Sequence, residues 1–179
     1  MFHRSERLFL RPAFQEDWEA IYAAIGSDAE LARNLARAPW PYEASDARDF
    51  AALPQDWRLP HFLVTLPGTG VIGSAGLGEH DGAPEIGYWI AREFRGHGFA
   101  TEASEAVLRI AQTLGHRRLT AGHFTDNPAS GRVLRKLGFV PTGRLTQRHS
   151  RARGGLVDTV EYARDLDAQG DLPPVRRAA

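Results

Sequence analysis

A short turn with two glycines and one arginine carries the clearest chemical signal in the chain. It reads Arg95-Gly96-His97-Gly98-Phe99-Ala100-Thr101 and lies between a strand-like run, residues 85–90, and a run with helical spacing. A helix that begins in such a turn offers unpaired backbone N–H groups and the positive end of its dipole. Glycine lets the backbone approach a ligand closely, and Arg95 can add a charge-assisted contact. The turn therefore predicts an anion site, and phosphate is the usual anion.

Two familiar phosphate-binding motifs do not fit this turn. A dinucleotide fingerprint ends in glycine or alanine, whereas Thr101 stands at that position, and no acidic residue follows at the ribose spacing. A P-loop needs Gly-Lys-Ser/Thr, which does not occur here. The turn does match [Arg/Gln]-x-x-Gly-x-[Gly/Ala]. Taken alone, that short pattern also fits an ordinary tight turn between a strand and a helix.

A second motif occupies residues 127–139 and reads Asn-Pro-Ala-Ser-Gly-Arg-Val-Leu-Arg-Lys-Leu-Gly-Phe. Asn127 is a good N-cap and Pro128 fits the first helical position. Gly138 stands where a helix prefers to end. The motif therefore predicts a helix, with one strand between it and the glycine turn.

The two motifs in this order resemble those of the GNAT superfamily, the acyl-CoA-dependent N-acyltransferases. Similar words recur at residues 7–12, 39–42, 71–77 and 158–162. Together they resemble the ribosomal-protein N-terminal (alanine) acetyltransferase-like branch, and the resemblance covers roughly residues 5–166.

The resemblance implies acetyl-CoA as cosubstrate and no metal. It places the pyrophosphate on the glycine turn, the amide arm along a strand edge and the acyl group in a gap between two splayed strands. Asn127 is expected to contact the cofactor arm, to cap its helix, or both. The cofactor-binding residues expected on this basis are Trp89, Ile90, Ala91, Arg95, Gly96, His97, Gly98, Phe99, Ala100, Thr101, Asn127 and Ser130.

The implied reaction is direct attack of a primary amine on the thioester. The amine must first lose a proton, because its pKa is about 8 for an α-amino group and about 10.4 for lysine. Glu85 matches the family's frequent general base, and its alternative role is that of a solvent-facing glutamate at a strand end. His80 and His123 are further candidates. Cysteine is absent, so no cysteine can carry the acyl group.

The departing thiolate needs stabilisation or a proton. Many GNAT enzymes use a tyrosine on the helix of the second motif, where this chain has Leu134. Ser130 is the expected substitute, or else a hydrogen-bond partner of the cofactor. Tyr88 is a weaker candidate. The catalytic residues expected are therefore Glu85 and Ser130.

The acceptor amine is not specified by these motifs. A protein N-terminus, an amino acid, a polyamine and an aminoglycoside all fit, and the residues expected to contact it are Trp40, Tyr42 and Tyr88. Trp40 and Tyr42 could equally cover the core. The alternative function is a catalytically inactive CoA-binding regulatory or scaffold protein, a possibility that Leu134 leaves open.

The elements that must position these residues form an α+β (α/β/α layered) pattern. Strands are expected at residues 7–11, 61–66, 71–77, 85–90, 119–124, 139–140 and 156–162, and helices at 17–25, 29–38, 45–53, 101–114 and 128–137. Residues 144–153 are basic and polar and read as an exposed loop. The expected fold is the GNAT fold, with a mixed, mostly antiparallel sheet of about six to seven strands that is flanked by helices and splayed at the cofactor site.

Composition sets the remaining bounds. The chain has 179 residues, 42% hydrophobic and 25% charged, which fits one domain at residues 1–166 and a disordered tail at 167–179. Its formal net charge is zero, so no global field favours nucleic acid or an anionic membrane. No apolar run suggests a signal peptide or a membrane span. The expectation is a cytoplasmic monomer or homodimer.

Overall fold

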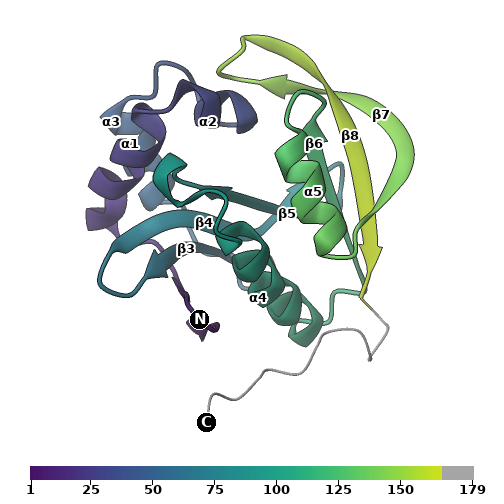
Figure 1. The fold of residues 1–179 in the computed structure, drawn as a ribbon, viewed down its shortest axis with the longest axis horizontal. Coiled ribbons are helices and arrows are strands. Elements are labelled where there is room, and N and C mark those ends of the chain that lie inside the picture. Colours follow the sequence, from purple (N-terminus) through teal and green to yellow (C-terminus); the bar gives the residue numbers. More distant parts are fainter. Residues whose placement is uncertain (167–179) are drawn as a thin grey trace.

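The structure, a computed structural model, describes residues 1–166, so the tail predicted at 167–179 lies outside the described residues. Within them, one mixed sheet has the strand order β1-β2-β3-β4-β5-β6-β8-β7 (Figure 1). Its strands are β1 (His3–Arg4), β2 (Phe9–Arg11), β3 (His61–Leu66), β4 (Gly70–His80), β5 (Ala83–Ile90), β6 (Arg118–Phe124), β7 (Val140–Ser150) and β8 (Gly155–Asp165). The predicted α+β class is confirmed. The sheet has eight strands rather than six to seven, because β1, only two residues long, carries no periodic signal.

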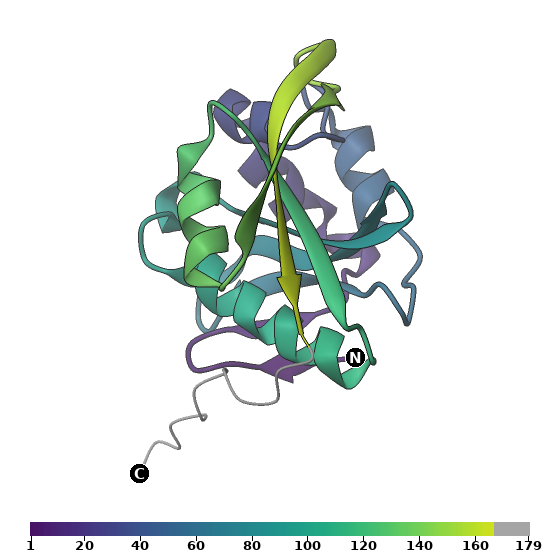
Figure 2. The same cartoon turned by 90° about the vertical axis from the view of Figure 1, so that its right-hand side faces the viewer.

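Helices cover both faces of this sheet. One side carries α1 (Trp18–Gly26), α2 (Ala29–Asn34) and α3 (Ala44–Ala51), and the other carries α4 (Phe99–Thr113) and α5 (Pro128–Lys136) (Figures 1 and 2). Short 3-10 turns, η1 (Gln15–Asp17) and η2 (Arg92–Phe94), precede α1 and α4. Side chains of β5 alternate between two cores: Ile86 and Ile90 pack in the α4/α5 cluster, whereas Trp89 packs in the α1–α3 cluster.

The sheet opens between β5 and β6. These are the one parallel pair in the described chain, and they pair only at Glu85 and Thr120. By contrast, β5 pairs with β4 from Ala83 to Ile90. The edge of β5 beyond Glu85 therefore faces a gap rather than a strand, as the predicted splay requires.

Residues 144–153 do not form the exposed loop that their composition suggested. They belong mostly to β7, which pairs antiparallel with β8, and only the turn from Arg151 to Gly154 lies outside the strands. β7 is the last strand in the sheet order. An edge strand tolerates polar and charged side chains. The sequence of β7 therefore lacks the apolar alternation by which a strand is predicted. The helix predicted at residues 29–38 also proved shorter, ending at Asn34.

Candidate active site

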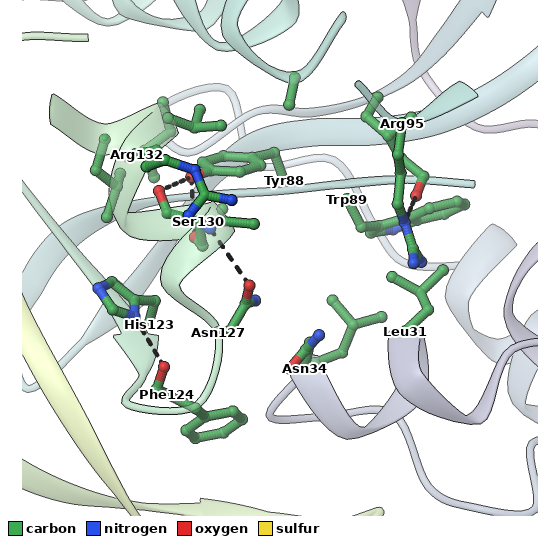
Figure 3. Close-up of a pocket in the computed structure, with 18 of the residues that line it drawn as sticks. Leu31, Asn34, Tyr88, Trp89, Arg95, His123, Phe124, Asn127, Ser130 and Arg132 are labelled. Carbon is green, nitrogen blue, oxygen red and sulfur yellow. Dashed lines mark hydrogen bonds between the residues drawn. The ribbon is translucent and has the colours of Figure 1, made fainter. Parts of the chain in front are cut away.

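A cavity of about 560 Å³ lies where β5 and β6 part. Its wall includes Tyr88 and Ser130 from the α4/α5 side of the sheet, and α2 supplies Leu31 and Asn34. In Figure 3, Asn127, the N-cap residue of α5, and Asn34 of α2 face the same open space from opposite sides. The cavity thus draws its wall from both layers of helices that cover the sheet.

Most of the predicted site residues meet at this cavity. It is lined by Glu85, Tyr88, Trp89, Ile90, Arg95, Gly96, Gly98, Phe99, Ala100, Thr101, Asn127 and Ser130. Ala91, His97, Trp40 and Tyr42 are not among its lining residues. Trp40 is exposed, and Tyr42 is buried in the α1–α3 core. Lining residues that sequence reasoning did not assign include Leu31, Asn34, Gly122, Arg132, Lys136 and Arg148.

The glycine turn has the backbone geometry of an anion site. Gly96 and Gly98 both have a φ of 81°, in the left-handed region, and Gly98 is the N-cap residue of α4. No side chain caps this helix start. A Cβ at Gly96 would meet no atom within 4 Å, so the backbone conformation, not lack of space, requires glycine there. The first N–H groups of α4 remain available to a ligand.

Arg95 is held by protein groups beside this turn. Its Nη2 donates to Asp28 Oδ2 at 2.7 Å, and its Nε donates to the Ile90 carbonyl at 3.0 Å. Asp28 is 2% exposed and also accepts from the Leu31 N–H and from Arg92. Burial raises the pKa of Asp28, but these hydrogen bonds and arginine charges outweigh it and lower that pKa overall. Asp28 therefore ties the glycine turn to the start of α2.

Glu85 is paired with an arginine that the sequence motifs did not indicate. Arg148 Nη1 donates to Glu85 Oε1 at 2.6 Å, and both side chains are largely buried. Arg148 stands on β7, 63 residues further along the chain. No short-range pattern joins two residues at that separation. Because residues 144–153 were expected to form a loop, the alternation of side chains along a strand was not used to predict which way Arg148 faces.

Tyr88 and Ser130 form a hydroxyl pair on the other face of β5. Tyr88 Oη lies 3.0 Å from Ser130 Oγ and also donates to the Ser130 carbonyl at 3.1 Å. Burial raises the pKa of Tyr88 to about 12, against the opposing effect of the Ser130 hydrogen bond. The phenol is therefore neutral at pH 7 and can donate. Leu134, which lies in the cavity wall on the same helix as Ser130, is buried and offers no proton.

The two histidine candidates occupy different environments. His123 lies in the cavity wall, with Nδ1 2.8 Å from the Phe124 carbonyl and Nε2 3.3 Å from the Tyr162 hydroxyl. Because a carbonyl only accepts, Nδ1 carries the hydrogen, and both ring nitrogens are engaged. His80 ends β4, 3.7 Å from Asp81, and does not line the cavity.

Comparison with known proteins decides the family. Residues 7–140 match the family model described as an acetyltransferase (GNAT) domain. The chain belongs to the GNAT acetyltransferase family. Within it, the uncharacterized N-acetyltransferase YoaA of Bacillus subtilis is 36% identical over 151 residues, which are 80% of this chain and 85% of YoaA. The GNAT chain is therefore an acyltransferase by family, as its motifs predicted.

Two further relatives lie in the ribosomal-protein branch. The ribosomal-protein-serine acetyltransferase of Escherichia coli is 34% identical over 86 residues, 48% of each chain. The solved structure of RimL, a ribosomal α-N-protein acetyltransferase in complex with coenzyme A, has a TM-score of 0.78 at 24% identity, covering 94% of this GNAT chain and 99% of its own. The predicted fold and branch resemblance are confirmed.

No helix within residues 1–166 is long and apolar enough to cross a membrane. The same residues contain no group of three or more His, Asp or Glu side chains placed to hold a metal ion.

Proposed function

We propose that this GNAT protein moves an acetyl group from acetyl-CoA to a primary amine by direct attack in a ternary complex. The observation that carries the proposal is the cavity between β5 and β6, which has the glycine turn and Glu85 in one continuous wall. A cosubstrate anchored at the turn would reach the gap in the sheet. An amine beside Glu85 would meet it there.

The cofactor's place follows from the free edge of β5. The Ala91 N–H donates to the Ile72 carbonyl on β4. Because backbone groups alternate in direction along a strand, those of Ile90 point into the gap. The Ile90 carbonyl there accepts from Arg95 Nε, which leaves the Ile90 N–H as the group that would meet the cofactor. The amide arm of acetyl-CoA would pair along this edge. Its pyrophosphate would bind the first turn of α4, and the Asn127 and Ser130 side chains would contact the arm from α5.

The proposed roles divide between the two faces of β5. Glu85 and Tyr88 are three positions apart, so their side chains leave the strand on opposite faces. Glu85 would accept the proton of the amine. One hydroxyl of the Tyr88–Ser130 pair would donate a hydrogen bond to the departing thiolate, which leaves as the anion and takes its proton from solvent. Leu134 cannot make this contact. In the proposed arrangement the phenol comes from Tyr88 of β5, whereas many GNAT enzymes carry the corresponding tyrosine on the helix itself.

The acceptor contacts that we propose come from residues that line the cavity. Leu31 and Asn34 of α2, with Phe124 of β6, line it, whereas Trp40 and Tyr42 do not. We therefore propose that α2 and the strands beside Glu85, and not residues 39–42, contact the acceptor. We propose that the protein acts in the cytoplasm and that the acceptor is a protein N-terminus or a small amine.

A second function is kept because of two observations. Glu85 already accepts a short charge-assisted hydrogen bond from Arg148, and the family's tyrosine position holds Leu134. Both fit a catalytically inactive CoA-binding regulatory or scaffold protein. The presence of both Glu85 and Tyr88 on β5 favours an active enzyme over the inactive protein.

Acetyl-CoA turnover against a panel of amines separates the two functions. The panel contains N-terminal peptides, amino acids, polyamines and aminoglycosides, and the assay follows thiol release together with the mass of the amine product. The enzyme predicts amine-dependent release and an acetylated product for at least one member. Tight acetyl-CoA binding with no amine-dependent release would instead support the inactive protein.

A further inference from the structure

A cluster of three charged side chains spans the acceptor side of the sheet. Glu85 stands on β5, Glu161 on β8 and Arg148 on β7. Arg148 Nη1 lies 2.6 Å from Glu85 Oε1, and its Nη2 lies 3.5 Å from Glu161 Oε1. Glu161 Oε1 also accepts from the Thr146 hydroxyl at 2.9 Å. One guanidinium therefore bridges two carboxylates across β6, the strand that separates them.

Gly122 provides the passage for this bridge. In the sheet order, β6 and β8 lie between β5 and β7, so the Arg148 side chain must cross them to reach Glu85. A Cβ placed on Gly122 of β6 would lie 2.8 to 3.0 Å from three atoms of the guanidinium. The guanidinium thus rests directly against the backbone of β6. Any larger residue at position 122 would push it off Glu85.

The bridge leaves one buried donor of Arg148 without a hydrogen-bond partner in the described part of the chain. Arg148 Nε is buried and has no hydrogen-bond partner among residues 1–166. A buried donor without a partner destabilises the folded protein. Glu85 Oε2, by contrast, accepts no hydrogen bond within the described chain and belongs to a residue in the cavity wall. The arrangement gives up a donor on Arg148 while it fixes one oxygen of Glu85.

We propose that Arg148 is a positioning residue for Glu85. It holds Oε1 and so fixes the carboxylate, which leaves Oε2 to receive the proton of the acceptor amine. Gly122 makes this placement possible, and Glu161 steadies the guanidinium from the other side. The inference rests on the proposed role of Glu85 as base. On this account the effect of Arg148 on turnover passes through Glu85 and not through a direct contact with the acceptor.

A double-mutant cycle tests this inference. The variants are Arg148→Met, Glu85→Gln and the two combined, each assayed for kcat, for KM of the amine found in the panel and for acetyl-CoA affinity. Arg148→Met alone should lower kcat by about tenfold to a hundredfold, the range that a misplaced catalytic group costs. In the Glu85→Gln background the same change should alter kcat by less than about twofold, because its target is already gone. Acetyl-CoA affinity should not change.

Two further variants displace the guanidinium by other means. Gly122→Ala leaves Glu85 and Arg148 in the chain and should reproduce the loss of kcat. Arg148→Lys keeps the charge but not the fork, and should restore part of the activity that Arg148→Met loses. Arg144→Met is the matched control: Arg144 is exposed and lies 3.8 Å from Glu161 without contacting Glu85, so its loss should leave kcat unchanged.

The kinetic results that would contradict the inference can be told apart. Additive losses in the cycle would show that Arg148 acts on the acceptor or on the fold, and would overturn the inference. Unchanged kcat in both Arg148→Met and Gly122→Ala would do the same. If Glu85→Gln alone keeps wild-type turnover, the base assignment of the proposed function fails first, and the positioning role fails with it. Thermal unfolding of every variant identifies losses that come from misfolding.

Discussion

At the residue scale, the proposed chemistry depends on which oxygen of Glu85 is free. Glu85→Gln keeps the size of the side chain but removes the base, so kcat should fall by about 10²–10⁴-fold. Cofactor affinity should stay nearly intact, because the glycine turn is untouched. The loss should shrink as pH rises, since more of the amine is then already neutral. Steady-state turnover across pH measures this, and wild-type turnover throughout would make Glu85 a structural residue.

The hydroxyl pair opposite Glu85 makes a second prediction. Tyr88→Phe and Ser130→Ala should each slow turnover by less than Glu85→Gln does, because a thiolate whose parent thiol has a pKa of about 8.5 can depart unaided. Their effects should not add, since the two hydroxyls hydrogen-bond each other. A cycle of the two variants, read as kcat, checks this. Leu134→Tyr should not restore the family's tyrosine in a useful position, because Leu134 is buried and a larger side chain would overpack its site.

The glycine turn makes the prediction for the cofactor. Gly98→Val should weaken CoA binding at least tenfold, about 1.4 kcal/mol, because a β-branched residue resists the left-handed φ of 81°. Titration calorimetry measures the affinity. Gly78→Val is the control, since Gly78 lies in β4 with no atom within 4 Å of its Cβ position and no positive φ. Unchanged affinity in a folded Gly98→Val protein would remove the turn from the site.

At the element scale, Asp28 joins the start of α2 to the glycine turn. Asp28→Asn keeps the capping oxygen but removes the charge that pairs with Arg95 and Arg92. The pKa of Asp28 is lowered in the folded protein, so its charge stabilises the fold fully above the unfolded value of about 3.8 and progressively less as pH falls toward the folded value. Wild type should therefore unfold at a higher temperature than the variant at pH 7. The gap should narrow below about pH 4, and a gap independent of pH would contradict this.

Elements with strong periodicity or caps were predictable from sequence. β5, α4 and α5 lie where the motifs placed them, and Asn127 does cap α5 by accepting from the Ser130 N–H. β7 was missed because an edge strand with polar side chains has no apolar alternation to detect. The Glu85–Arg148 pair was missed for the same reason, since only the pairing of β7 with β8 brings Arg148 to the sheet. The Tyr88–Ser130 contact likewise depends on tertiary packing, because it joins residues 42 positions apart on β5 and α5.

At the scale of the whole molecule, shifted pKa values predict sensitivity to acid. Burial lowers the pKa of His3 and of His61, so stability should begin to fall as pH drops below about 6.5. In Asp17, Asp28 and Glu102, burial raises the pKa, but hydrogen bonds and arginine charges outweigh it and lower the net value. Their contribution is lost below about pH 4. Thermal melts from pH 8 to pH 3 should show a shallow loss followed by a steep one, and a flat profile would contradict this account.

In the proposed mechanism, acetyl-CoA and the amine are bound together in the cavity between β5 and β6 when the acetyl group is transferred. This claim is tested most directly by intact mass after a brief incubation of the protein with labelled acetyl-CoA, with and without the amine. Direct attack predicts label on the amine only when both substrates are present, and no stoichiometric acetyl group on the protein alone. An acetylated protein that forms without amine and then passes its label to added amine would contradict it.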